Sequence, residues 1–231
     1  MFEELTPERV KNNEFTVTLQ PKALYSFTTT TGQHKAVANP PEDKPFPFPY
    51  RADFDNEPLG ATPAYFSDQG GAFEVVQRED RKGNCLRQVI TRNAIEWERA
   101  VINQTVLGDT LWKDYTVGCD VYFTDPYSYA SVMSRVTEMH RSHKKPDAYI
   151  LKLQSSGKWN LMAGSKELAS GFISLKGKTW HSLVLQTSGS QVKAVINGIE
   201  VSTLDDTSFS HGMAGIGSSF TRVDFDNFVV K

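Results

Sequence analysis

Residues 115–123 alternate between apolar and mostly polar or small side chains, and this pattern constrains the fold more than any other feature of the sequence. Tyr115, Val117, Cys119, Val121 and Phe123 occupy the odd positions, with mostly polar or small residues between them. Successive side chains of a β-strand point to opposite faces of the sheet, so the pattern predicts a half-buried strand.

Similar segments recur along the chain and are separated by turn residues. The apolar runs 183–185 and 192–196 flank Ser188-Gly189-Ser190, and Asn197-Gly198 then leads into 199–201. Asn-Gly favours a two-residue hairpin turn because both positions tolerate positive φ. Many short strands with little helical periodicity predict an all-β protein with a jelly-roll or concanavalin-like (laminin-G-like) β-sandwich. Further strands are expected at 72–77, 85–91, 130–136, 148–154, 158–163 and 223–230.

Proline clusters in one segment, residues 39–49, which reads NPPEDKPFPFP. Proline at this density favours an extended connector and cannot join the interior of a sheet. We therefore expect a linker at 39–49 between a partial β-sandwich segment at 1–38 and a large sandwich domain at 50–231. The first segment holds two candidate strands, 15–19 and 24–30, which amount to a short β-hairpin whose sheet partners would lie elsewhere.

Charge and hydropathy exclude several classes of protein. The 25 basic and 27 acidic residues give a net charge of −2, so no basic field is available for nucleic acid. The sequence has no 18-residue apolar run for a membrane span, and residues 1–5 do not begin a signal peptide. Cys85 and Cys119 lie in apolar, strand-like runs, where two buried free thiols compete with a disulfide. Asn103-Gln104-Thr105 is a glycosylation sequon.

Acidic residues mark both ends of the expected sandwich. Asp53 and Asp55 would lie on one side of a strand, about 7 Å apart, and Asp226 lies between Phe225 and Phe228 in a core-like run. Termini of sandwiches commonly meet, so these carboxylates could share a calcium ion, which takes six to eight oxygen ligands. The alternative is that each acid hydrogen-bonds local backbone at a strand end.

A series of short motifs resembles, in order, the C-terminal lectin domain of glycoside hydrolase family 59, the galactocerebrosidases. Residues 15–19 and 25–29 are similar to the last strands of that family's small β-sandwich domain, so the resemblance covers nearly the whole chain. The motifs within the expected sandwich are YRADFD at 50–55, DQGGAFE at 68–74, LRQV at 86–89, IEW at 95–97, GD at 108–109 with Trp112, CDVY at 119–122 and FDNF at 225–228.

The resemblance implies one structural calcium ion held by Asp53, Asp55, the backbone carbonyl of Asn84 and Asp226. It also implies an upstream catalytic βα-barrel as the partner domain, a galactosylceramide or β-galactoside substrate class, and a lysosomal or secreted location. Asp55 and Asn84 depart from the family's residue types, which alters the charge of the site and leaves only a backbone ligand at Asn84.

The chain itself is not expected to be an enzyme. Retaining glycosidases need two carboxyl groups about 5 to 5.5 Å apart, and Glu96 and Glu98 on either side of Trp97 are the candidates for intrinsic glycosidase activity. A salt-bridged or solvated face explains this pair better. His140 and His143 lie in a basic segment, 139–146, that lacks the spacing of a zinc site.

Sugar binding is a hypothesis based on the fold resemblance and on aromatic side chains in expected loops. Tyr127, Tyr129 and Trp159 could stack on pyranose rings, although core packing explains most aromatic residues equally well. The leading interpretation is a non-catalytic, calcium-stabilised accessory domain that supports the substrate cleft of a glycosidase. The alternative is a free-standing carbohydrate-binding or laminin-G-like adhesion module.

Overall fold

The computed structural model describes residues 5–30, 42, 44–92, 102–138 and 146–231 of the 231-residue chain. The chain divides into two compact units, one up to Pro45 and one from Phe46 onward. The second unit begins inside the expected linker because the Phe46 ring packs against Tyr50, Tyr65 and Trp112, with centroids 5.0 to 5.3 Å apart.

The first unit does not form the hairpin expected at 15–19 and 24–30. Residues 5–30 contain a single antiparallel bridge, between Lys11 and Glu14, and no strand. The chain does fold back, since the Phe15 and Phe27 rings lie 5.6 Å apart. A two-stranded segment without a sheet to cover it is marginal in water, which explains why the ladder is missing.

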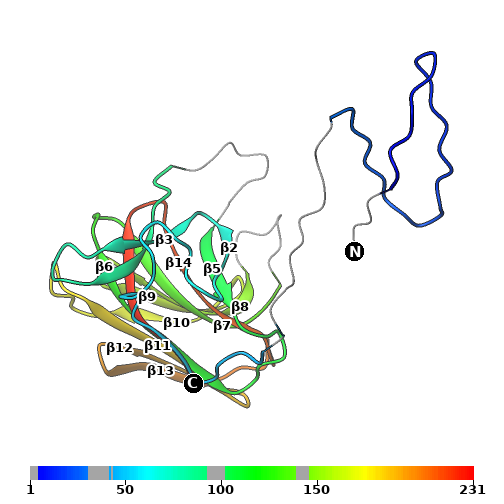
Figure 1. Cartoon of the computed structure of the whole chain (residues 1–231). Coiled ribbons are helices and arrows are strands. Elements are labelled where there is room, and N and C mark those ends of the chain that lie inside the picture. The colour runs from blue at the N-terminus through cyan, green and yellow to red at the C-terminus, as the bar shows by residue number, and fades with distance from the viewer. Residues whose placement is uncertain (1–4, 31–41, 43, 93–101, 139–145) are drawn as a thin grey trace. The chain divides into compact units, whose positions relative to one another are not determined.

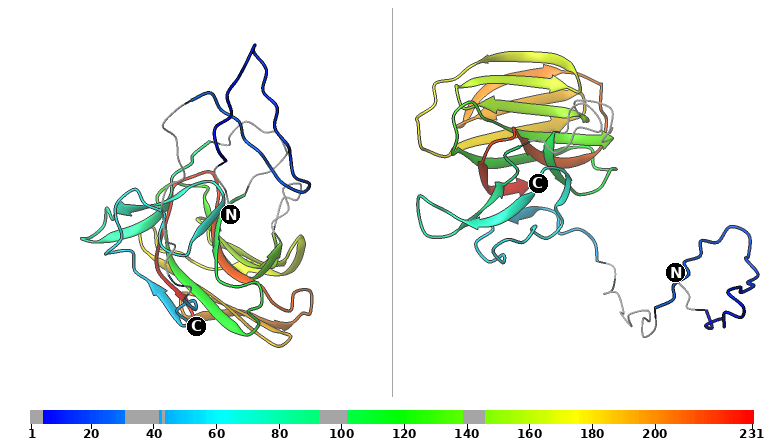
Figure 2. Two further views of the ribbon diagram at one scale, coloured as in Figure 1. Left: turned by 45° about the vertical axis from the view of Figure 1, so that its right-hand side comes forward. Right: turned by 90° about the horizontal axis from the view of Figure 1, so that it is seen from above.

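The second unit is a sandwich of two antiparallel sheets, as the sequence predicted (Figures 1 and 2). The eight-stranded sheet has the order β13-β12-β11-β6-β15-β4-β3, and β1 pairs with β15 off this path. Its strands are β1 (Tyr50–Ala52), β3 (Phe73–Gln77), β4 (Asn84–Gln88), β6 (Tyr115–Phe123), β11 (His181–Ser188), β12 (Gln191–Ile196), β13 (Ile199–Asp205) and β15 (Val223–Val230).

The second sheet has seven strands in the order β10-β9-β8-β7-β14-β5-β2. Within the described ranges, no helix is long and apolar enough to cross a membrane. The strands of this sheet are β2 (Ser67–Gly70), β5 (Asn103–Leu107), β7 (Tyr129–Glu138), β8 (Asp147–Gln154), β9 (Lys158–Ala163), β10 (Lys166–Phe172) and β14 (Met213–Ser218).

The main core lies between the two sheets and draws one side chain in two from each central strand. Tyr115, Val117, Cys119 and Val121 of β6 are all at most 4% exposed, which confirms the alternation seen in the sequence. Burial of each large apolar side chain contributes about 1.5 to 3 kcal/mol.

The predicted Asn-Gly hairpin is also confirmed. Asn197 and Gly198 have φ values of 51° and 75° and connect β12 to β13, where Ile196 pairs with Ile199. Positive φ at both positions is the signature of a tight turn that matches the twist of its strands.

Both cysteines are buried free thiols. Cys85 lies on β4 and Cys119 on β6, and β15 runs between these two strands. Cys119 belongs to the core between the sheets, whereas the neighbour of Cys85, Leu86, holds the core position on β4. The two sulfur atoms therefore lie on opposite faces of the sheet, which excludes a disulfide between them.

Candidate functional site

The expected calcium ligands lie near a junction on one edge of β15. On this edge β15 pairs with β4 up to the Phe225–Leu86 position and with β1 from the Phe228–Ala52 position. Asp226 lies between the two pairings. Residues 53–55 continue from β1, and Asn84 begins β4, so both approach Asp226 from opposite directions.

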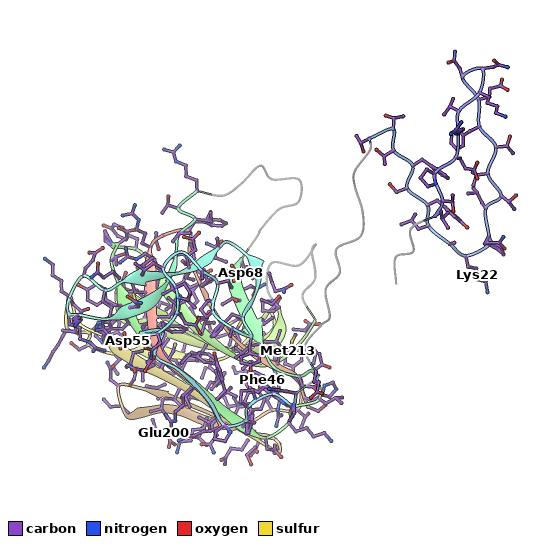
Figure 3. The ribbon with its side chains drawn as sticks, viewed as in Figure 1. Lys22, Phe46, Asp55, Asp68, Glu200 and Met213 are labelled. Atoms are coloured by element: carbon purple, nitrogen blue, oxygen red, sulfur yellow. The ribbon has the colours of Figure 1, made fainter. Side chains whose placement is uncertain are left out.

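Asp55 and Asn84 contact each other directly at this junction, where Asp55 is labelled in Figure 3. The Asn84 backbone N–H donates to Asp55 Oδ1 at 2.7 Å, and the Asn84 side-chain amide donates to the Asp55 carbonyl at 3.3 Å. Gly83 makes room for this carboxylate, because a Cβ at that position would lie 2.5 Å from Asp55 Oδ1. Asp53 instead caps its own loop, and its Oδ1 accepts the Asp55 N–H at 3.2 Å.

The Asp226 carboxylate is 1% exposed and is paired with arginine. Its Oδ2 accepts a hydrogen bond from Arg78 and lies 3.5 Å from the Arg81 guanidinium, while its Oδ1 accepts the Asn227 N–H at 2.7 Å. Burial raises the pKa of Asp226, and these hydrogen bonds and charges oppose the rise.

Arg78 is the residue of this site that sequence reasoning missed. Its guanidinium also donates to both oxygens of Asp80, at 2.9 and 2.8 Å, and lies 4.1 Å from the centroid of the Trp180 ring. The Trp180 indole N–H donates to Asp80 Oδ2 at 2.8 Å. The hydrogen bond from Arg78 lowers the pKa of Asp80 to about 2. An Arg-x-Asp sequence directly after an expected strand was the signal available.

The donor types at the junction fit calcium, which prefers carboxylate and carbonyl oxygens. Among the residues that the structure describes, no three His, Cys, Asp or Glu side chains are grouped closely enough to hold a metal ion. The positive charge that pairs with the Asp226 carboxylate is that of the Arg78 guanidinium. The backbone therefore brings the expected ligands to the same edge of β15, but their side chains do not form a metal-binding cluster, and Arg78 already neutralises Asp226.

The three aromatic residues expected to bind sugar lie in different environments. Trp159 is 7% exposed and belongs to the core, and a Cβ at Gly171 would lie 2.8 Å from its indole ring. That prediction needs correcting, because no ring face of Trp159 is open to a ligand. Tyr129 is half-buried, and Lys152 Nζ lies 3.8 Å from its ring centroid. Tyr127 is 96% exposed.

The structure also corrects the prediction that Asn103 is a glycosylation site. Asn103 and Thr105 are fully buried in β5, and the Asn103 side-chain amide donates to the Ser219 carbonyl at 3.0 Å. A glycan on Asn103 has no room in this fold. Glu96 and Glu98, like His140 and His143, lie outside the described residues.

Comparison with solved structures defines the class of this domain. The carbohydrate-binding module CBM66 from Bacillus subtilis is similar over 75% of this chain and 99% of its own, with a TM-score of 0.54 and 15% identity. A Bacillus subtilis protein of unknown function with a galectin-like fold covers 78% of this chain and 94% of its own, with a TM-score of 0.52 and 13% identity. The fold is therefore that of a lectin-like β-sandwich.

Sequence comparison then gives the family. Residues 68–231 match the family described as "Galactocerebrosidase, C-terminal lectin domain". The chain is 30% identical to the galactocerebrosidase of Danio rerio, over 100% of this chain and 37% of that protein. It is 32% identical to the galactocerebrosidase of Mus musculus, over 95% of this chain and 34% of that protein. The chain belongs to the galactocerebrosidase C-terminal lectin domain family. It spans about a third of the length of the curated relatives that it matches.

Proposed function

We propose that this chain acts as a non-catalytic accessory domain of a galactocerebrosidase-like glycosidase in the lysosome or outside the cell. The observation that carries the proposal is the match of residues 68–231 to the lectin domain of that family. Its partner would be a catalytic βα-barrel upstream in the same protein, acting on a galactosylceramide or other β-galactoside. The sandwich would support the substrate cleft of that barrel.

A direct assay tests the non-catalytic role. We expect no turnover of a chromogenic β-galactoside by this chain alone, whereas the same chain joined to a catalytic barrel should support turnover. Hydrolysis by the chain alone that is lost in Glu96→Gln would contradict the proposal and would identify an intrinsic glycosidase.

We further propose that a calcium ion stabilises the β1–β4–β15 junction, with Asp53, Asp55, the Asn84 carbonyl and Asp226 as its ligands. The support is the strand register, which brings the chain segments that carry these residues to the same edge of β15 on either side of Asp226. The calcium ion would balance the charges of Asp53 and Asp55, while Arg78 and Arg81 already face Asp226. Ligand binding to the folded state alone stabilises it by about 2.7 kcal/mol at 100 times the dissociation constant.

Thermal melting with calcium and with a chelator tests this site. We expect calcium to raise the melting temperature and Asp55→Asn to abolish most of that rise, because Asn keeps an acceptor for the Asn84 N–H but removes a charge. Asp109→Asn is the control, since Asp109 Oδ1, like Asp55 Oδ1, accepts a backbone N–H, in this case that of Leu111 at 2.8 Å. Equal melting with and without calcium would contradict the calcium site.

A second candidate function is that of a free-standing carbohydrate-binding or laminin-G-like adhesion module. The observation that favours it is the fold similarity to CBM66, which extends over 99% of that module. Binding of glycans by the chain without a catalytic domain would support this role.

A further inference from the structure

One end of the sandwich carries a pocket of about 180 Å³ that is separate from the β15 junction. Residues 123–126, Ser155, residues 175–179 and His181 line it. Pockets for drug-sized ligands measure about 300 to 1,000 Å³, so this one has room for about a single six-membered ring with its substituents.

The pocket walls combine apolar surface with polar groups of both charges. Phe123 and Leu175 contribute the apolar part, while Asp125, Lys176 and Lys178 contribute charge. Two lysines alone would favour an anion, but the Asp125 carboxylate in the same pocket opposes one. This mixture suits a neutral ligand that has many hydroxyl groups and an apolar ring face.

Asp125 is held in place and keeps one oxygen for a ligand. Its Oδ2 accepts the Arg222 backbone N–H at 3.1 Å, and its carbonyl accepts the Ser128 hydroxyl at 2.7 Å. Its Oδ1 has no hydrogen-bond partner in the part of the chain that the structure describes. A carboxylate oxygen fixed in this way is a strong acceptor for a sugar hydroxyl.

The opposite wall, residues 176–179, is fixed by hydrogen bonds to its own backbone. The Thr179 hydroxyl donates to the Lys176 carbonyl at 3.0 Å, and His181 Nε2 lies 3.1 Å from the same oxygen. The Asn197 Nδ2 atom lies 3.2 Å from His181 Nδ1 and can only donate, since Asn197 Oδ1 accepts the Ser182 N–H, so Nδ1 accepts and Nε2 carries the proton. This tautomer of His181 holds the loop in the conformation that forms the pocket.

Tyr127 is not part of the pocket lining but directly follows Pro126, which is, and its side chain is 96% exposed. Its backbone has a φ of 62°, a conformation that is rare and unfavourable for a bulky residue. Neither the exposure nor the backbone conformation stabilises the fold. The ring is available to stack on a flat apolar ligand face.

We propose that this pocket binds a single hexose unit, as a free sugar or as the end of a glycan, with Asp125 and the two lysines hydrogen-bonding its hydroxyls and Tyr127 stacking on its ring. The inference rests on the proposed carbohydrate-binding role and assigns it a site. Aromatic stacking combined with a few fixed polar groups is how a small polar ring is oriented in such sites.

Titration of the full chain with methyl β-galactoside and methyl β-glucoside by NMR tests the site. We expect a dissociation constant of about 1 mM for the preferred sugar, as befits so small a ligand. Tyr127→Ala should weaken binding about fivefold or more and Tyr127→Phe should preserve it, because Phe keeps the stacking face. Asp125→Asn, which keeps the acceptor for the Arg222 N–H, should weaken binding about tenfold.

Tyr65→Ala is the matched control, since Tyr65 is also an exposed tyrosine (55%) with positive φ (70°) but, unlike Tyr127, does not adjoin a lining residue in the sequence. Melting curves establish that each variant is folded. Sugar binding that survives both Tyr127→Ala and Asp125→Asn would overturn the site and leave the carbohydrate-binding role standing. No binding of either sugar at about 50 mM would overturn both the site and the carbohydrate-binding role. Displacement of the sugar by inorganic phosphate would overturn the inference in favour of an anion site.

Discussion

At the scale of single residues, the pairing of Arg78 with Asp226 dominates the energetics of the β15 junction. Both side chains are at most 4% exposed, so each charge depends on the other for its stabilisation. A buried ion pair adds little relative to an apolar pair, but the loss of one partner leaves an uncompensated charge. Asp80 and Trp180 hold the guanidinium in position from the other side.

Replacing Arg78 should therefore be far more costly than replacing its neighbour Arg81. We expect Arg78→Met to lower the free energy of unfolding by about 3 to 5 kcal/mol, because Asp226 loses its buried partner and keeps only the exposed Arg81 guanidinium at 3.5 Å. The Arg81 side chain is 55% exposed and lies 3.5 Å from the same carboxylate. Arg81→Met should therefore change the free energy of unfolding by at most about 1 kcal/mol. Urea denaturation measures both, and equal effects would show that Arg78 does not carry the pair.

Asp80 should make the domain sensitive to acid. Its pKa is lowered to about 2 by the hydrogen bond from Arg78, so its contribution to stability is present above its ordinary pKa near 4 and is lost as the pH falls toward 2. The buried Asp226 has a raised pKa and contributes with the opposite sign. We expect the melting temperature of Asp80→Asn to fall less than that of the wild type between pH 4 and pH 2. Parallel curves would contradict this assignment.

At the scale of elements, the strands predicted from the sequence are those with a strong period-two pattern or a continuous apolar run. Residues 115–123, 158–163 and 223–230 match β6, β9 and β15 at both ends, and seven other strands were found within a few residues. The sequence did not predict β1, β2, β5, β10 and β14. β1 and β2 have only three and four residues, β5 is buried along its whole length, and β14 places Gly215 and Gly217 where alternation would show.

The tight turn between β12 and β13 gives a prediction for an element. Gly198 has a φ of 75°, and a Cβ added there would have no atom within 4 Å. The cost of adding a methyl group therefore comes from backbone strain and not from a clash. We expect Gly198→Ala to lower the free energy of unfolding by about 1 to 2 kcal/mol.

Gly177→Ala is its control, because Gly177 also has open space around it and its φ is not in the left-handed region. Thermal melting should show a much smaller change for Gly177→Ala. A loss as large as that of Gly198→Ala would mean that backbone conformation is not the cause.

At the scale of the whole molecule, the sequence predicted the sandwich and the meeting of its two ends, but not whether every aromatic side chain lies in the core. Alternation on β9 places Trp159 on the opposite face from Lys158 and Asn160. The same alternation would arise whether the Trp159 face lies in the core or binds a ligand. The structure puts Trp159 in the core. Arg78 was missed because its partners Asp226 and Trp180 are 148 and 102 positions away in the chain, and no local pattern records such contacts.

The two thiols report on the integrity of the whole fold. Burial raises the pKa of both Cys85 and Cys119, so neither forms the reactive thiolate in the folded protein. We expect an aromatic disulfide reagent to label neither thiol without denaturant and both thiols in urea, at a rate set by global unfolding. Fast labelling of either cysteine in the folded protein would contradict this prediction.

The position of β15 has a consequence for how the protein is made. This strand follows the fourteen other strands of the described residues in the sequence, yet it pairs with β1, β4 and β6 inside the larger sheet. A nascent chain emerging from the ribosome thus cannot close that sheet until residues 223–230 are free of the exit tunnel. Until then β4 and β6 expose edges that invite aggregation, and a stop codon before residue 223 would yield no shortened domain at all.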